Sequence, residues 1–185
     1  MTDHASSARR RFLRHGAQLA AASSLPLIAK PARAALSGAR GLALVHTHTR
    51  ETLDLVYAVD ERYDPSALGT LNRFLRDHYT GDIGRIDPGV FELLHRVRQL
   101  LGSSASFDVI SGYRCPATNA QLRNTRGGGV ATRSLHMDGR AIDVRLPGVA
   151  LADLRDAALS LRVGGVGFYP REQFVHLDTG RVRSW

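Results

Sequence analysis

Two segments, residues 134–143 and residues 174–178, limit the possible fold of this chain more than any other part of the sequence. They contain two imidazoles and a carboxylate, on His136, His176 and Asp143, which is the ligand set of a zinc ion whose fourth position is open to water. His136 and Asp143 are seven residues apart, about 23 Å along a strand or about 10.5 Å along a helix. Two donor atoms on one zinc lie roughly 3–3.5 Å apart, so the chain must turn between them. The Met-Asp-Gly sequence after His136 predicts that turn, because glycine can adopt a positive φ.

Two short segments in which apolar and polar residues alternate contain the other two candidate ligands. In residues 141–145 apolar side chains alternate with Asp143, and in residues 174–178 they alternate with His176. Two neighbouring strands with these sequences would point their apolar side chains to a core and both polar side chains to the opposite face. The turn would then bring His136 to the same face. A loop histidine and ordinary polar strand residues are the alternative, but several partners occurring together favour a metal centre.

The pattern Ser-x-His-x-x-Gly-x-Ala-x-Asp, followed by a strand with His-x-Asp, resembles that of the LAS metallopeptidases, named for lysostaphin, D-alanyl-D-alanine peptidases and sonic hedgehog. Within that group the chain most resembles the murein endopeptidase K branch of the bacterial cell envelope, with the specific motifs in residues 91–180. The resemblance implies a zinc ion held by His136, Asp143 and His176. It also implies cleavage of the cross-linked stem peptides of peptidoglycan.

The segment Ser-Gly-Tyr-Arg that ends at Arg114 is similar to a segment of the same family. There the arginine is thought to bind a carboxylate of the substrate. The residues agree with this role, because Arg114 follows a plausible buried strand at residues 107–110 and precedes a helix that begins with proline. A guanidinium group suits bidentate recognition of a carboxylate. A surface arginine or a structural ion pair is the alternative.

The general base does not follow from the resemblance. Several relatives place a catalytic histidine two residues before the last metal ligand, or a glutamate three residues before it, whereas this chain has Phe174 and Gln173 there. Asp178 is the first candidate, because it lies on the same strand face as His176. It could instead orient a ligand histidine. Glu172 is the second candidate, and a solvated turn residue is the alternative for it.

Residues 1–34 are expected to be a signal peptide and not part of the fold. Arg9 and Arg10, followed by x-Phe-Leu, resemble the twin-arginine export signature, and residues 17–29 form an apolar run too short to span a bilayer stably. A surface helix with a basic start is the alternative. Removal of six basic side chains and one acid with residues 1–34 would lower the formal net charge from +8 to +3. The mature protein, residues 35–185, is therefore expected in the periplasm, with no nucleic-acid partner and no stable membrane anchor.

The mature length suits one domain with one core. Strands are expected at residues 41–49, 53–59, 107–110, 141–145, 163–169 and 174–178, and helices from Pro65, from Pro88 and over 151–161. The predicted class is α+β, with an antiparallel sheet that carries the metal and helices on its other face. The resemblance implies a fold like those of hedgehog and the D-alanyl-D-alanine peptidases. His46 and His48 share one face of the first strand, a spacing that can bind a metal, but with no third ligand nearby they are expected at the strand surface.

The sequence and the resemblance together indicate a zinc-dependent murein endopeptidase with peptidoglycan as its substrate, acting as a monomer. A D-alanyl-D-alanine carboxypeptidase or dipeptidase is the alternative within the same chemistry. A zinc-containing peptidoglycan-binding module without catalysis is the alternative from another class, since no base stands at the usual positions.

Overall fold

The computed structural model describes residues 38–125 and 130–185, so the expected signal segment at residues 1–34 lies outside the described residues. The described residues form strands and helices in this order: β1 (Ala39–His46), β2 (Thr52–Val59), β3 (Arg62–Tyr63), α1 (Pro65–Phe74), α2 (Pro88–Leu100), β4 (Phe107–Ser111), α3 (Pro116–Thr125), β5 (Ala141–Arg145), α4 (Leu151–Leu161), β6 (Gly165–Tyr169), β7 (Phe174–Asp178) and β8 (Arg183–Ser184).

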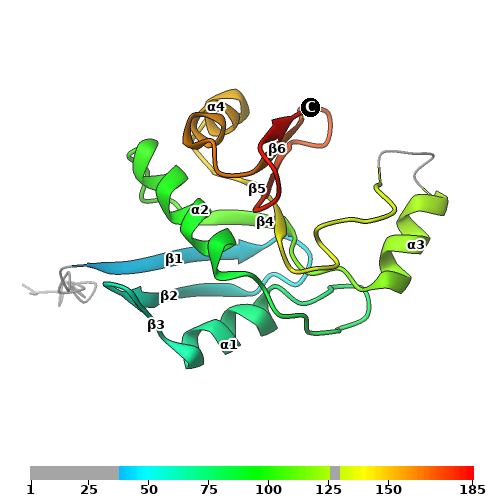
Figure 1. Cartoon of the computed structure of the whole chain (residues 1–185), viewed down its shortest axis with the longest axis horizontal. Helices are drawn as coiled ribbons and strands as arrows, with labels where there is room; N and C mark the ends of the chain where they lie inside the picture. The colour runs from blue at the N-terminus through cyan, green and yellow to red at the C-terminus, as the bar shows by residue number, and fades with distance from the viewer. Residues whose placement is uncertain (1–37, 126–129) are drawn as a thin grey trace, which may run out of the picture. The chain divides into compact units, whose positions relative to one another are not determined.

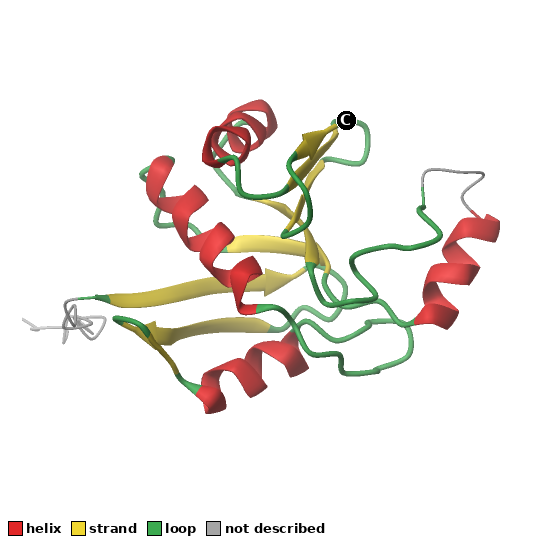
Figure 2. Cartoon of the chain, in the orientation of Figure 1, coloured by secondary structure: helices red, strands yellow, loops and turns green. Residues whose placement is uncertain are grey.

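The strands belong to one sheet in the order β3-β2-β1-β4-β5-β7-β6-β8 (Figure 2). Neighbouring strands are antiparallel except for two parallel pairs, β1 with β4 and β6 with β8. The predicted α+β class is confirmed, and the sheet, predicted to be antiparallel, is antiparallel at every strand pair except these two. Across the two described ranges, no helix combines the length and the apolar composition that crossing a bilayer would require.

Helices α1 and α2 begin where the sequence indicates. The Asp64 carboxylate accepts hydrogen bonds from the backbone N–H groups of Ser66 and Ala67, and Asp87 accepts one from that of Gly89. A proline follows each aspartate, and its missing N–H costs nothing in the first turn of a helix. These caps fix the start of both helices.

One hydrophobic core lies between the sheet and helices α1, α2 and α4. Figure 1 shows α3 set apart from α2 and α4. The core takes the inward side chains of the central strands, among them Val109, Ile142, Val144, Val175 and Leu177. Since successive side chains of a strand alternate in direction, the residues between them face away from this core.

A bulge in β4 changes which of its side chains face the core. Val109 pairs with Val144 on the core side, but the register then shifts, and Ser111 pairs with Asp143 on the opposite side. A bulge places two residues of one strand against one residue of its partner. The extra residue turns Ser111, and the chain that leads to Arg114, toward the face that carries Asp143.

The prediction that His46 lies on the strand surface is wrong. Strand β1 ends at His46, whose side chain is 0% exposed and lies 5.9 Å from the Phe74 ring between ring centroids. His46 continues the inward row of Leu42 and Leu44, which alternation along the strand requires. His48 lies beyond the strand, in the turn that leads to β2, and is exposed.

Candidate metal centre

Strands β5 and β7 bring two of the three expected ligands together. Asp143 pairs with His176, while the adjacent pair, Ile142 and Leu177, is buried in the core. Because side chains alternate along each strand, Asp143 and His176 share the face opposite α1, α2 and α4. Their proximity therefore follows from the antiparallel register of two adjacent strands.

His136 reaches the same point from the turn before β5. Gly139 has a φ of 65°, and a Cβ at this position would collide with the carbonyl oxygen of Arg85, so the turn requires glycine. The Nδ1 of buried His136 lies 2.7 Å from the carbonyl oxygen of Gly112. Since that oxygen can only accept, Nδ1 carries the hydrogen and Nε2 keeps a lone pair for the site.

The three donor atoms form a compact triangle. The Nε2 of His136 lies 3.2 Å from the Nδ1 of His176 and 3.3 Å from the Oδ1 of Asp143, and the latter two atoms are 2.8 Å apart. Donors on a tetrahedral zinc stand roughly 3–3.5 Å apart, so these residues fit such an ion. In the part of the chain that the structure describes, no other group of three histidine, cysteine or acidic side chains brings its donor atoms this close.

Opposite charges face each other in this triangle. Burial opposes ionisation of Asp143, but its interactions with His136 and His176 outweigh burial and hold its pKa well below the usual range. Burial also opposes protonation of His176, but hydrogen bonds with Asp143 and Asp178 raise its pKa to about 9. A divalent cation can therefore take the place of the His176 proton beside a carboxylate that is already charged.

Asp178 lies on the far side of His176 from the donor triangle. Its Oδ2 is 3.1 Å from the Nε2 of His176, and both of its oxygens bind Arg183, at 2.7 and 3.0 Å. The backbone N–H groups of Gly165 and Gly180 also donate to it, and its side chain is 0% exposed. This position corrects the expectation of a general base, because every lone pair is engaged and the His176 ring separates the carboxylate from the donor triangle. It fits the other role weighed from the sequence, orienting a ligand histidine.

Glu172, the second candidate for the base, lies outside the pocket that opens beside Asp143. It is exposed in the turn that joins β6 to β7, and it is not one of the residues that line the pocket beside Asp143.

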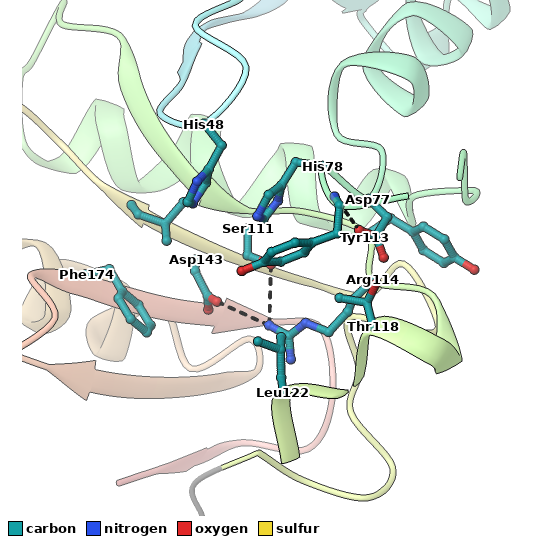
Figure 3. Close-up of a pocket in the computed structure, with 12 residues that line it drawn as sticks. His48, Asp77, His78, Ser111, Tyr113, Arg114, Thr118, Leu122, Asp143 and Phe174 are labelled. Carbon is teal, nitrogen blue, oxygen red and sulfur yellow. Dashed lines mark hydrogen bonds and ion pairs between the residues drawn. The ribbon is translucent and has the colours of Figure 1, made fainter. Parts of the chain in front are cut away.

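An open pocket of about 410 Å³, a volume that includes open solvent, lies beside Asp143 (Figure 3). Arg114 lines it, with Nη2 at 3.8 Å from the Oδ2 of Asp143 and 3.4 Å from the Oγ of Ser111. Its Nη1 lies 3.4 Å from the Oδ1 of Asn119 on α3. The pocket therefore joins a candidate metal ligand to a guanidinium group that neighbouring side chains hold in place.

The same pocket is lined by two histidines for which the sequence predicted no functional role. His48 and His78 stack with ring centroids 4.0 Å apart and an angle of 5° between the planes. Burial, followed by the nearby charges of His48 and His46, lowers the pKa of His78 to about 4, so His78 is neutral at pH 7. The rings face each other in parallel planes, so their in-plane lone pairs do not converge on one ion.

Two further side chains support the site and were missed from the sequence. Arg183 binds Asp178, and the indole of Trp185 lies 5.3 Å from the His176 ring between centroids. Arg183 begins the short strand β8, and Trp185 directly follows that strand. An arginine shortly after a His-x-Asp strand was the available signal, but a strand of two residues has no periodicity to mark it.

Comparison with known proteins identifies the family to which this chain belongs. The family model described as peptidoglycan L,D-endopeptidase MepK, of the M15 peptidases, matches residues 34–185. The chain is 44% identical over 179 residues to the Escherichia coli K12 protein of that name and likewise to one from Shigella flexneri, with 96% of each chain covered. It is 39% identical over 147 residues to a probable peptidoglycan L,D-endopeptidase MepK of Haemophilus influenzae, covering 79% of this chain and 78% of the relative. No solved structure matches it. Since the match spans all of residues 35–185 and includes the donor triangle, this chain belongs to the MepK family of M15 peptidases.

Proposed function

We propose that this protein is a zinc-dependent endopeptidase that hydrolyses peptide cross-links of peptidoglycan. The observation that carries the proposal is the convergence of His136, Asp143 and His176 within 2.8–3.3 Å of one another beside an open pocket. The relatives named peptidoglycan L,D-endopeptidase support the substrate class. A zinc ion held by these three residues would polarise a scissile carbonyl and lower the pKa of a water ligand toward neutrality.

Arg114 is assigned to substrate binding. Its guanidinium group lines the pocket next to the metal ligand Asp143. Guanidinium binds carboxylates with two parallel hydrogen bonds, and the stem peptides of peptidoglycan carry several carboxylates. Holding one of them at Arg114 would orient the neighbouring amide toward the three metal ligands, which favours reaction by proximity.

Proton transfer is assigned to His48 in place of Asp178 and Glu172. His48 is exposed at the pocket, whereas Asp178 is buried behind His176 and Glu172 lies outside the pocket. An imidazole can take and return a proton near neutral pH. The neutral His78 ring stacked on His48 holds it in place without adding a competing charge.

The cellular location rests on the N-terminal segment. We propose that residues 1–34 direct export by the twin-arginine pathway and that residues 35–185 act in the periplasm as a monomer without a membrane anchor. Replacing Arg9 and Arg10 together by lysine should leave the full-length precursor in the cytoplasm. Processing at the wild-type rate would contradict this assignment.

The finer fold assignment is also a proposal. We infer that the sheet and its metal-bearing face correspond to those of hedgehog and the D-alanyl-D-alanine peptidases. An experimental structure with zinc bound, superposed on a member of each group, tests this. Metal ligands on non-equivalent strands would contradict it.

Digestion of purified cross-linked muropeptides tests the activity. With zinc, dimeric muropeptides should be converted to monomers, and a chelator or the substitution Asp143→Asn should abolish the conversion. Release of a terminal D-alanine without loss of dimers would instead indicate a carboxypeptidase. Binding to sacculi without any product would indicate a non-catalytic module.

A further inference from the structure

Strand β8 is held at the edge of the sheet, next to β6. It pairs in parallel with β6, Gly165 opposite Arg183 and Val166 opposite Ser184. The carbonyl oxygen of Trp185 accepts a hydrogen bond from the backbone N–H of Phe168 at 2.9 Å. These backbone contacts place the segment one strand beyond β7, which carries His176 and Asp178.

The side chains of Arg183, in β8, and of Trp185, directly after β8, nevertheless reach β7 across β6. Arg183 holds both oxygens of Asp178, and Asp178 in turn lies 3.1 Å from the Nε2 of His176. The Trp185 ring lies 5.3 Å from the His176 ring between centroids, inclined at 49°. The two side chains therefore act on the same metal ligand, one through a carboxylate and one by direct packing.

Glycines in β6 make this crossing possible. A Cβ at Gly165 would collide with the Arg183 guanidinium and the Asp178 carboxylate, and a Cβ at Gly167 would come within 2.7 Å of the Trp185 indole. Neither glycine has a positive φ, so backbone strain does not demand them. Glycine is needed at both positions because a side chain on this face of β6 would occupy the space through which Arg183 or Trp185 passes.

The crossing side chains are themselves fixed. The Trp185 Nε1–H donates to the hydroxyl oxygen of Tyr169 at 2.8 Å, and the Arg183 guanidinium lies 4.8 Å above the indole ring. Asp178 is fully buried, and a buried carboxylate is costly unless it is paired. Arg183 supplies that pairing, so its loss would weaken the hold of Asp178 on the His176 ring.

We infer that Arg183 and Trp185 are positioning residues for the metal site, reaching over the glycine face of β6 to fix the ring of His176. Asp178 and Arg183 then determine which nitrogen of His176 faces the metal, leaving Nδ1 to the donor triangle. This inference rests on the metal site of the proposed function, but not on the peptidase activity.

Zinc affinity, measured by competition with a chromophoric chelator, tests the inference. Arg183→Gln should bind zinc about 10–100-fold more weakly, as is typical when the partner of a ligand histidine is lost. Arg183→Lys should recover part of that loss, since it restores the charge without the planar fork. Trp185→Ala should weaken binding about tenfold, and Trp185→Phe should recover part of it.

Arg181→Gln is the matched control, because Arg181 is exposed two residues away and its loss removes the same charge. It should bind zinc as the wild type does. Circular dichroism of each metal-free variant establishes that it is folded. If Arg183→Gln does not fold, Trp185→Ala decides the test, because its side chain is 50% exposed and its removal leaves no buried charge.

Wild-type affinity in folded Arg183→Gln or in Trp185→Ala would overturn the inference for that residue. An equal loss in Arg181→Gln would also overturn it, because the effect would then be one of net charge. Failure of the proposed function has a different signature. In that case the wild type binds one zinc per chain without cleaving muropeptides, while the ranking of the variants by zinc affinity stays as predicted.

Discussion

Zinc binding should release a proton from His176. In the metal-free protein, burial opposes the charge on His176, but hydrogen bonds with Asp143 and Asp178 raise its pKa to about 9. A metal binds only the neutral imidazole. At pH 7 about 1% of His176 would be neutral, since each pH unit below the pKa lowers that fraction roughly tenfold.

The size of the effect follows from this pKa. Between pH 7 and pH 9 the zinc association constant should rise about 50-fold, or about 2.3 kcal/mol, because half of His176 is neutral when the pH equals its pKa. Above pH 9 this contribution should level off. The Asp178→Asn variant should show a smaller rise, because one of the two carboxylates that stabilise the charged ring has lost its charge.

Isothermal titration calorimetry provides the assay. Zinc is titrated at pH 6 in buffers with different ionisation enthalpies, and the dependence of the observed heat on the buffer gives the number of protons released. About one proton should come from His176. The low pH keeps the contribution of a zinc-bound water small, since its pKa is about 7. Zero protons released at pH 6 would refute the reasoning.

Three further predictions follow from the same geometry. Without metal, the free energy of unfolding should fall by up to about 3 kcal/mol between pH 6.5 and pH 9. The reason is that the pKa of His176 is raised in the folded state, so the stabilisation is lost as the pH rises through that pKa. Urea unfolding in the presence of a chelator measures this, and a free energy of unfolding that does not change with pH would count against it. Gly139→Ala should destabilise the protein by more than about 1 kcal/mol and weaken zinc binding, since the new Cβ meets the Arg85 carbonyl; unchanged values for both would show that the turn adapts. His48→Gln should lower kcat by about 100-fold or more with zinc affinity unchanged, and a kcat close to that of the wild type would remove His48 from proton transfer.

Local pattern was sufficient to predict the elements that carry the metal ligands. The alternation in β5 and β7 is regular, and a single register places Asp143 opposite His176. The Asp-Pro starts of α1 and α2 are local signals that tertiary contacts do not override. The turn at Gly139 was likewise predictable, because the short spacing between ligands demanded one.

The two incorrect predictions, for His46 and Asp178, have different causes. His46 continues the inward row of β1, and its parity with Leu42 and Leu44 was visible in the sequence; its polarity suggested a surface position instead. The role of Asp178 depends on which nitrogen of His176 faces the metal. Spacing on one strand cannot reveal this, because Arg183 approaches from beyond another strand.

The pocket was also beyond local pattern. His48 lies in the turn between β1 and β2, and His78 follows α1. Their stacking depends on how those two turns meet, which no periodicity encodes. The bulge in β4 that brings Ser111 to the metal face is set by pairing with β5, so it could not be read from β4 alone.

Diffraction from zinc-loaded crystals at the zinc absorption edge tests the central claim most directly. The account predicts one anomalous peak per chain, about 2.0–2.2 Å from the Nε2 of His136, the Oδ1 of Asp143 and the Nδ1 of His176, with Asp178 still bound to the other nitrogen of His176. A peak bound elsewhere, or bound through the Nε2 of His176, would contradict it.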